Sequence, residues 1–290
     1  MASKQKWPEQ FQLLELSERT LRHGLLFPFA ADEVLGRYIG RGAMPIVHIW
    51  QAAKGFVLGL RDRRLPYAEE AMDWLKQQGY EVIVRNSGGA AVPLDAGVVN
   101  ISIIFPSSQA IGDFRSDFDY MVSLLQHSLQ SYGSDVKVGE ITGAYCPGDY
   151  DVSVHGRKFC GIAQRRQAKA FIIQAFVVVE GSGDERSALV RAFYERATAR
   201  LKADEAGVGA ERHTNKGVTS EVNHPIVKEG TMASLQELLG VPNTAAFIAH
   251  IKSSLAQRGT IIDHTELLEQ KEHMESIIAL MSQLKARYNR

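Results

Sequence analysis

The spacing of apolar and polar residues divides the chain into short helices and strands. Apolar residues at helical spacing predict helices over residues 31–40 (ADEVLGRYIG), 67–79 and 114–132. The segment LLFPFA, at residues 25–30, is expected to be a loop. Short β-rich runs predict strands at 46–50, 55–60, 80–85 and 98–105.

The region from 136 to 180 has a strand pattern. The run VSVHGRKFCGI predicts a hairpin that turns at His155-Gly156, which would pair Ser153 with Lys158 and Val154 with Arg157. The run AFIIQAFVVVEG, at 170–181, is continuously apolar and is typical of a strand inside a sheet.

The last third of the chain is expected to be mostly helical. Helices are predicted at 188–201, 232–239, 243–257 and 264–288, with a long loop or linker at 206–229. The whole pattern indicates an α+β fold, in which a mixed β-sheet is flanked by helices and followed by a helical C-terminal part.

Composition excludes several classes of protein. The chain has 33 basic and 33 acidic residues, so its charge gives no indication of nucleic acid or an anionic membrane as a partner. No apolar run approaches the roughly 20 residues of a membrane helix, and the N-terminus lacks the apolar core of a signal peptide. We therefore expect a cytoplasmic protein. Its two cysteines, Cys146 and Cys160, are too few for a structural zinc site, and no metal is expected.

Two segments contain residues suited to chemistry. In RNSGGAAVPLD, at 85–95, the adjacent Gly88 and Gly89 let the backbone approach a ligand, although spacing alone favours a tight turn. In GAYCPGDYD, at 143–151, the Pro-Gly after Cys146 indicates a turn and a partly exposed thiol, as a nucleophile requires. A half-buried loop cysteine is the alternative. Lys158 shares the hairpin and would stabilise a thiolate, unless it is simply a solvated strand lysine.

Both segments resemble signatures of the biotin/lipoyl protein ligase superfamily. RNSGGAAVPLD resembles its Arg-x-Ser/Thr-Gly-Gly-x-Ala-Val motif, and GRKFCGIAQRR, at 156–166, is similar to its Gly-Lys/Arg-Lys segment, whose lysine contacts the acyl carbonyl. The resemblance implies the superfamily's catalytic-domain fold at 41–250, an N-terminal segment packing on it at 1–40, and a helical C-terminal extension at 251–290. It also implies substrate-binding roles for Arg85, Ser87, Gly88, Gly89, Ala90, Gly161 and Ala163.

Within that superfamily, GAYCPGDYDVSVHGRKF and LDAGVVNISIIFP most resemble the octanoyl-[glycine cleavage H protein]:protein octanoyltransferases, or lipoyl amidotransferases. That resemblance implies a thioester on Cys146, activated by Lys158. It implies glycine cleavage H protein as octanoyl or lipoyl donor and the lipoyl domains of 2-oxoacid dehydrogenase E2 subunits as acceptors, with no cofactor and no ATP. We expect the acyl chain to lie in an apolar slot near Val92 and Ile101.

Two alternatives remain open. One is an octanoyltransferase that takes its acyl group from acyl carrier protein. The other is a non-catalytic lipoyl-domain-binding module, against which the intact Cys146 and Lys158 argue. Cys160 departs from the superfamily pattern, where a small residue is more usual, and is interpreted as a buried strand residue.

Overall fold

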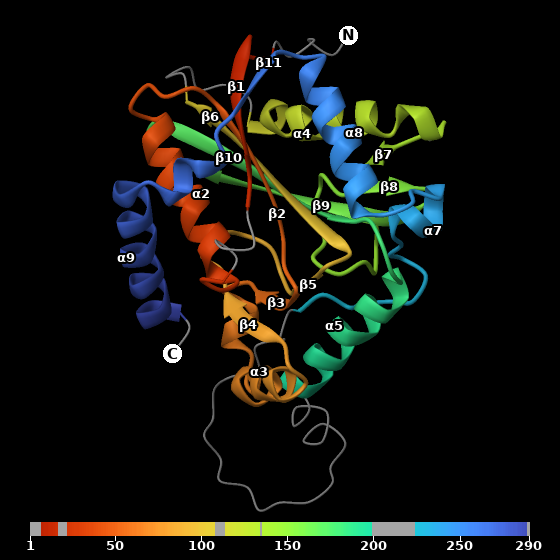
Figure 1. Cartoon of the computed structure of the whole chain (residues 1–290). Helices are drawn as coiled ribbons and strands as arrows, with labels where there is room; N and C mark the ends of the chain where they lie inside the picture. The colour runs from red at the N-terminus through yellow and green to blue at the C-terminus, as the bar shows by residue number, and fades with distance from the viewer. Residues whose placement is uncertain (1–6, 17–21, 108–113, 134, 199–223, 289–290) are drawn as a thin grey trace, which may run out of the picture.

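An eight-stranded mixed sheet runs through the centre of the molecule, in the order β11-β1-β2-β6-β10-β9-β8-β7 (Figure 1). The computed structural model describes residues 7–16, 22–107, 114–133, 135–198 and 224–288. Strand β1 pairs in parallel with β2 and β11, and the other pairs are antiparallel. The strands of this sheet are β1 (Gln10–Glu15), β2 (Ile46–Gln51), β6 (Val98–Pro106), β7 (Lys137–Val138), β8 (Val152–Val154), β9 (Arg157–Arg166), β10 (Ala170–Val178) and β11 (Thr260–Asp263).

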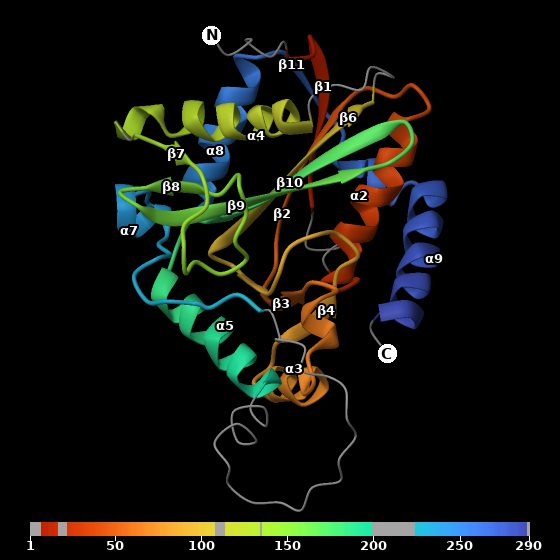
Figure 2. The same cartoon turned by 180° about the vertical axis from the view of Figure 1, so that it is seen from behind.

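A smaller sheet lies below the large one, with strand order β4-β3-β5. Its strands are β3 (Lys54–Leu58), β4 (Glu81–Val84) and β5 (Val92–Asp95). Helix α3 packs against α5 beside this sheet, at the bottom of Figures 1 and 2. Strand β3 pairs in parallel with β4 and antiparallel with β5.

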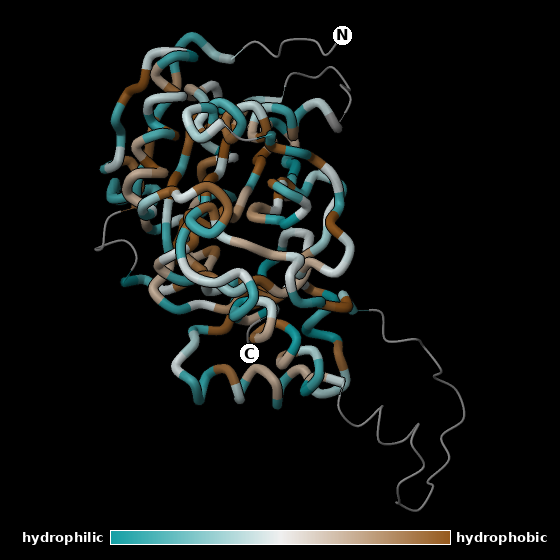
Figure 3. The backbone as a smooth tube through the Cα atoms, turned by 90° about the vertical axis from the view of Figure 1, so that its right-hand side faces the viewer, coloured by the Kyte–Doolittle hydropathy of each residue, from teal (hydrophilic) through white to brown (hydrophobic). Residues whose placement is uncertain are grey.

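Helices cover both faces of the large sheet, so its central strands are apolar on both sides. Helices α4 and α8 pack together on one face, and α2 covers the other with α9 outside it (Figure 2). In Figure 3 hydrophobic stretches, in brown, alternate with hydrophilic ones, in teal, along the backbone. The helices are α2 (Leu26–Ile39), α3 (Ala68–Gln77), α4 (Phe114–Ser128), α5 (Gly183–Ala197), α7 (Leu235–Leu239), α8 (Thr244–Ala256) and α9 (Lys271–Tyr288), with 3-10 turns η1 (Asp62–Arg64), η2 (Gln130–Tyr132) and η3 (Thr265–Glu269).

Strand β6 shows how the two faces differ. Val99, Ile101 and Ile103 point into the core beneath α4 and α8, while Val98 and Ile104 belong to the core on the α2 side. Between these last two, on the same face, the alternation places Asn100 and Ser102. Two polar residues therefore interrupt the apolar face that carries α2.

The predicted α+β class, hairpin and strand positions are confirmed. Ser153 pairs with Lys158 and Val154 with Arg157, and the turn residues His155 and Gly156 have φ of 51° and 74°. Both are in the left-handed region that a two-residue hairpin turn requires. The helix expected to begin at Asn243 is capped by that residue, whose side chain accepts a hydrogen bond from Ala246 N–H.

Other boundaries were wrong. The expected loop at 25–30 is the first part of α2, because Pro28 lies in the first turn, where an N–H has no intrahelical partner. Helix α5 begins at Gly183 rather than at 188, capped by the Ser182 side chain. Helix α9 begins at Lys271 rather than at His264, because Thr265–Glu269 form the 3-10 turn η3. Most of the loop expected at 206–229 lies outside the described residues.

Both ends of the chain contribute to the large sheet. Strand β11, which was not predicted, pairs with β1 at one edge, and β1 pairs with β2. The division of the chain into three parts stays a prediction. Among the described residues, no helix has both the length and the apolar character needed to cross a membrane.

Candidate active site

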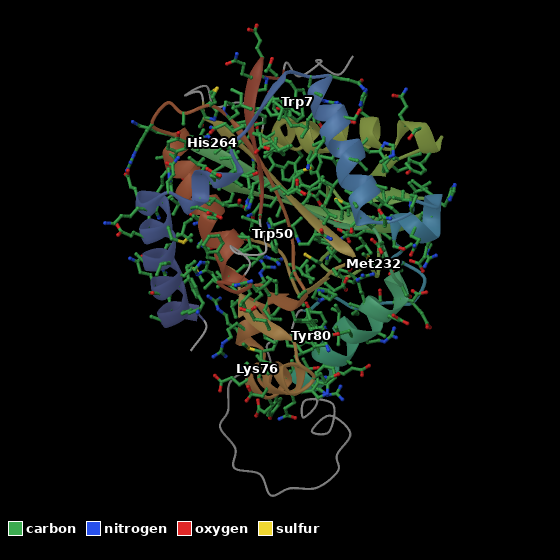
Figure 4. The ribbon with its side chains drawn as sticks, viewed as in Figure 1. Trp7, Trp50, Lys76, Tyr80, Met232 and His264 are labelled. Atoms are coloured by element: carbon green, nitrogen blue, oxygen red, sulfur yellow. The ribbon has the colours of Figure 1, made fainter. Side chains whose placement is uncertain are left out.

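A cavity of about 310 Å³ lies between the two sheets. Its size suits a small ligand. Trp50, near the centre of Figure 4, forms part of the wall, and its indole meets the ring of Phe29 from α2 edge-on. The cavity is also lined by Arg85, Ser87, Gly88, Gly89, Val92, Leu94, Asn100, Ser102, Cys146, Pro147, Gly148, Gly161, Ile162, Ala163, Gln164, Gln174, Ala175 and Phe176.

The thiol of Cys146 lies in the cavity wall, partly exposed. Its backbone has a φ of 48°, a left-handed conformation that is uncommon for a residue other than glycine. The Sγ atom accepts a hydrogen bond from Ala90 N–H at 3.3 Å, and Arg85 Nη2 lies 3.7 Å away. Two hydrogen-bond donors are therefore directed at the sulfur.

Arg85 also shapes the glycine loop. Its Nε donates to Gly88 O at 2.9 Å and its Nη2 to Ala90 O at 2.8 Å, so the loop closes around the guanidinium. Gly89 has a φ of +100°, and a Cβ there would overlap Arg85 Nη2 and lie 3.1 Å from Cys146 Sγ. This position therefore requires glycine, both for its conformation and for the approach of the sulfur.

Lys158 is fully buried beneath the cysteine, so it is not a solvated strand lysine. Its Nζ donates to Tyr145 O at 2.9 Å and to Cys146 O at 2.6 Å, and forms an ion pair with Asp151 Oδ1 at 2.8 Å. An ammonium has three protons, and these three partners use all of them. Lys158 thus acts on Cys146 through its backbone carbonyl rather than through a hydrogen bond to Sγ.

Asp151 completes this buried group. Its carboxylate receives the Lys158 ion pair and, at 3.3 Å, the N–H of Gly148, which belongs to the turn after Cys146. Burial raises the pKa of Asp151 to about 6, and the nearby Lys158 opposes that rise. Two bonds consequently fix the turn that contains Cys146. Lys158 of the hairpin holds the Cys146 carbonyl, and Asp151 holds the Gly148 N–H.

A second buried network supports the glycine loop from behind. Ala91 N–H donates to Tyr194 Oη at 3.2 Å, Tyr194 donates to Asp62 Oδ1 at 2.9 Å, and Asp62 Oδ2 accepts Gly59 N–H at 2.8 Å. Burial raises the pKa of both Tyr194 and Asp62. This chain of bonds links the loop to α5 and to the end of β3.

The structure brings together the residues singled out in the sequence. Each predicted substrate-binding residue lines the cavity, except Ala90, whose N–H contacts Sγ. Val92 lines the cavity, and the strand that contains Ile101 contributes Asn100 and Ser102, although the Ile101 side chain itself points to the opposite face. That this cavity holds the acyl chain stays a prediction. Cys160 is also in that opposite core, and burial raises the pKa of its thiol.

Several site residues were not found from the sequence. Asp151 ends the segment GAYCPGDYD, but the sequence alone indicates no role for it. Asn100, Ser102 and Gln174 do have a sequence signal. Each is a polar residue in an otherwise apolar strand, and each faces the cavity. Asp62 and Tyr194 have no such sequence signal, because they come into contact only in the folded chain. The described residues contain no group of three or more His, Cys, Asp or Glu side chains suited to a metal ion.

The fold is that of lipoate–protein ligases. The structure of lipoate-protein ligase A bound with ATP aligns with a TM-score of 0.65, at 18% identity, over 96% of this chain and 95% of that one. A bi-partite lipoate protein ligase from Thermoplasma acidophilum aligns with a TM-score of 0.62, at 20% identity, over 94% and 92%. The family model described as the lipoyl protein ligase A/B catalytic domain matches residues 25–256.

Sequence relatives show which group of proteins with this fold the chain belongs to. The octanoyl-[GcvH]:protein N-octanoyltransferase of Anoxybacillus flavithermus is 37% identical over 82% of this chain and 81% of its own length. That of Geobacillus kaustophilus is 41% identical over 73% and 69%. The chain therefore belongs to the lipoyl protein ligase A/B catalytic domain family and, within it, to the octanoyl-[GcvH]:protein N-octanoyltransferase family.

Proposed function

We propose that this protein transfers an octanoyl group from a lysine of glycine cleavage H protein to a lysine of a lipoyl domain, through a thioester on Cys146. The observation that carries the proposal is the position of Cys146 Sγ. It lies in the wall of a largely apolar cavity and faces two hydrogen-bond donors, Ala90 N–H and Arg85. The names of the relatives support GcvH as donor and octanoyl as the group transferred.

In the first step the Cys146 thiolate attacks the carbonyl carbon of the octanoyl-lysine amide. An S–C bond forms, the amide C–N bond breaks, and the donor lysine leaves as an amine after taking up a proton. Negative charge moves from the sulfur to the carbonyl oxygen during the attack. Ala90 N–H and Arg85 Nη2 are the donors that reach the sulfur, so they are placed to stabilise this charge.

In the second step the lysine of the acceptor attacks the thioester. The new C–N bond replaces the S–C bond, the attacking amine loses a proton, and Cys146 is released as thiolate. One lysine amide is exchanged for another, so the free energy of the whole reaction is close to zero. The reaction therefore needs neither ATP nor a cofactor, in contrast to a ligase that starts from a free acid.

Lys158 prepares Cys146 for both steps. Its bonds to the carbonyls of Tyr145 and Cys146 hold the turn in the left-handed conformation that directs Sγ toward Ala90. Its ammonium is buried beneath the cysteine and paired with Asp151, so the turn is held by a fixed, fully engaged group. This role differs from the direct contact with the acyl carbonyl that the resemblance implied for this lysine, since the three protons of the ammonium are already engaged.

The test uses purified enzyme, octanoylated H protein and an unmodified E2 lipoyl domain, without nucleotide. Mass spectrometry should show the octanoyl group leaving one carrier and appearing on the other. Transfer that requires ATP and free octanoate would contradict the proposal. Transfer from octanoyl-acyl carrier protein but not from octanoylated H protein would favour the alternative donor. The predicted cytoplasmic location is consistent with these carriers and stays a prediction.

A further inference from the structure

Two rows of residues cross the large sheet at the cavity, and all of them except His48 line it. Trp50, Asn100, Phe176 and Gly161 are successive cross-strand partners and form the row nearer Cys146. A second row consists of His48, Ser102, Gln174 and Ala163. The rows are two residues, or about 7 Å, apart along the strands.

The first row suits the reacting end of an acyl chain. Lys158 Nζ lies 5.5 Å from the centre of the Phe176 ring, and Tyr145, next to the nucleophile, stacks on that ring with centroids 5.9 Å apart. Gly161 provides space here, because a Cβ would overlap the Phe176 ring. A thioester on Cys146 thus begins over this row and its chain runs toward the second.

The second row ends in a rigid polar group. Asp32 of α2 is fully buried, and its Oδ2 accepts hydrogen bonds from Ser102 Oγ and Gln174 Nε2, both at 2.6 Å. Its Oδ1 lies 2.7 Å from His48 Nδ1. Three strands are therefore tied to one carboxylate of the helix above them, and Ser102 and Gln174 present their side chains to the cavity.

Beyond this group the sheet is closed. The next row contains Ile46, Ile104 and Ile172, each fully buried in the core that α2 covers. An extended octanoyl chain is about 9 Å long, because each C–C bond of about 1.5 Å advances the zigzag by less than its own length. Eight carbons therefore span the first row and reach the second.

We propose that Gln174, held by Asp32 together with Ser102, is the stop that limits the acyl group to about eight carbons. This inference rests on the proposed function. An apolar slot without a stop would favour longer chains, by about fourfold in kcat/KM for each methylene. With the stop, two further methylenes must displace a hydrogen-bonded group or bend the chain. This typically lowers kcat/KM by about 5- to 150-fold.

The experiment compares octanoylated and decanoylated H protein as donors, with kcat/KM for thioester formation as the readout. Wild type should use the decanoyl donor about 5- to 150-fold less well than the octanoyl donor. Gln174→Ala should raise the decanoyl-to-octanoyl ratio about tenfold or more, because it removes the side chain that fills the end of the cavity. Gln174→Ser, which shortens the side chain but keeps a hydroxyl, should raise the same ratio.

Gln167→Ala is the matched control. Gln167 also bonds to α2, through Glu33 O at 2.9 Å, but it does not line the cavity. Its replacement should leave the chain-length ratio unchanged.

Equal use of the two donors by wild type overturns the inference even if every variant misfolds. An unchanged ratio in folded Gln174→Ala and Gln174→Ser also overturns it. If wild type forms no thioester with either donor, the proposed function itself has failed.

Discussion

The buried Lys158–Asp151 ion pair predicts that stability and activity respond differently when one or both of its charges are removed. Lys158 is fully buried and Asp151 almost so, with 2.8 Å between the charged atoms. Replacing Lys158 by methionine keeps the side chain's length but leaves the Asp151 carboxylate buried without its counter-ion. Removing one partner of such a pair typically costs about 3–5 kcal/mol. Lys158→Met should therefore lose about that much of its free energy of unfolding.

The double variant Lys158→Met/Asp151→Leu should behave differently. With both charges gone, neither side chain pays for desolvation, and replacement of a buried pair by apolar residues is often neutral or stabilising by about 1–4 kcal/mol. The double variant should therefore match or exceed wild type in stability. It should nevertheless lose acyl transfer by about 100-fold or more, because nothing holds the carbonyl of Cys146.

Urea unfolding at pH 7 measures the first effect and thioester formation by intact mass measures the second. Lys76→Met is the control for stability, because Lys76 forms an exposed ion pair with Asp73 at 2.8 Å. Such surface pairs contribute at most about 1 kcal/mol. A double variant that transfers octanoyl groups at the wild-type rate would refute the positioning role of Lys158. A stable Lys158→Met single variant would refute the burial argument.

Two further predictions concern Gly89 and the pH dependence of stability. Gly89→Ala should abolish thioester formation, because φ is positive at this position and a Cβ would overlap Arg85. Gly88→Ala should lower activity much less, since a Cβ there meets nothing within 4 Å. Alkylation of the Cys146 thiol and intact mass measure both effects. Burial raises the pKa of Asp151 from 3.8 to about 6, so its contribution to stability is full below pH 3.8 and is lost as pH rises through 6. The unfolding free energy of wild type relative to Asp151→Asn should therefore fall by about 2 kcal/mol between pH 4 and pH 7 in urea titrations, and a constant difference would contradict the raised pKa.

Local patterns predicted the elements with strong local signals. The hairpin at His155-Gly156, the strand at 170–178 and the amphipathic helix containing Met121 and Leu125 all followed from periodicity and turn chemistry. Strand β11 could not be found in this way. It is short and only half-buried, and it forms because β1, some 250 residues earlier in the chain, offers a free edge.

The motifs predicted which residues meet at the site, but not how they are bonded. Lys158 was expected near the thiol, and it is, yet its burial and its bonds to backbone carbonyls depend on Asp151 and on the turn geometry of Cys146. The limit that we propose for the acyl slot depends on α2, whose Asp32 meets Ser102 and Gln174 from strands far along the chain. Contacts of this kind have no local sequence signal.

The most direct test of the central claim is to locate the acyl group on the enzyme during turnover. Wild-type protein mixed with octanoylated H protein, without acceptor or ATP, should gain one hydroxylamine-labile octanoyl group, and peptide mapping should place it on Cys146. Cys160→Ala should gain it equally, and Cys146→Ala should gain none. An adduct on Cys160, or octanoyl transfer by Cys146→Ala at the wild-type rate, would contradict the account.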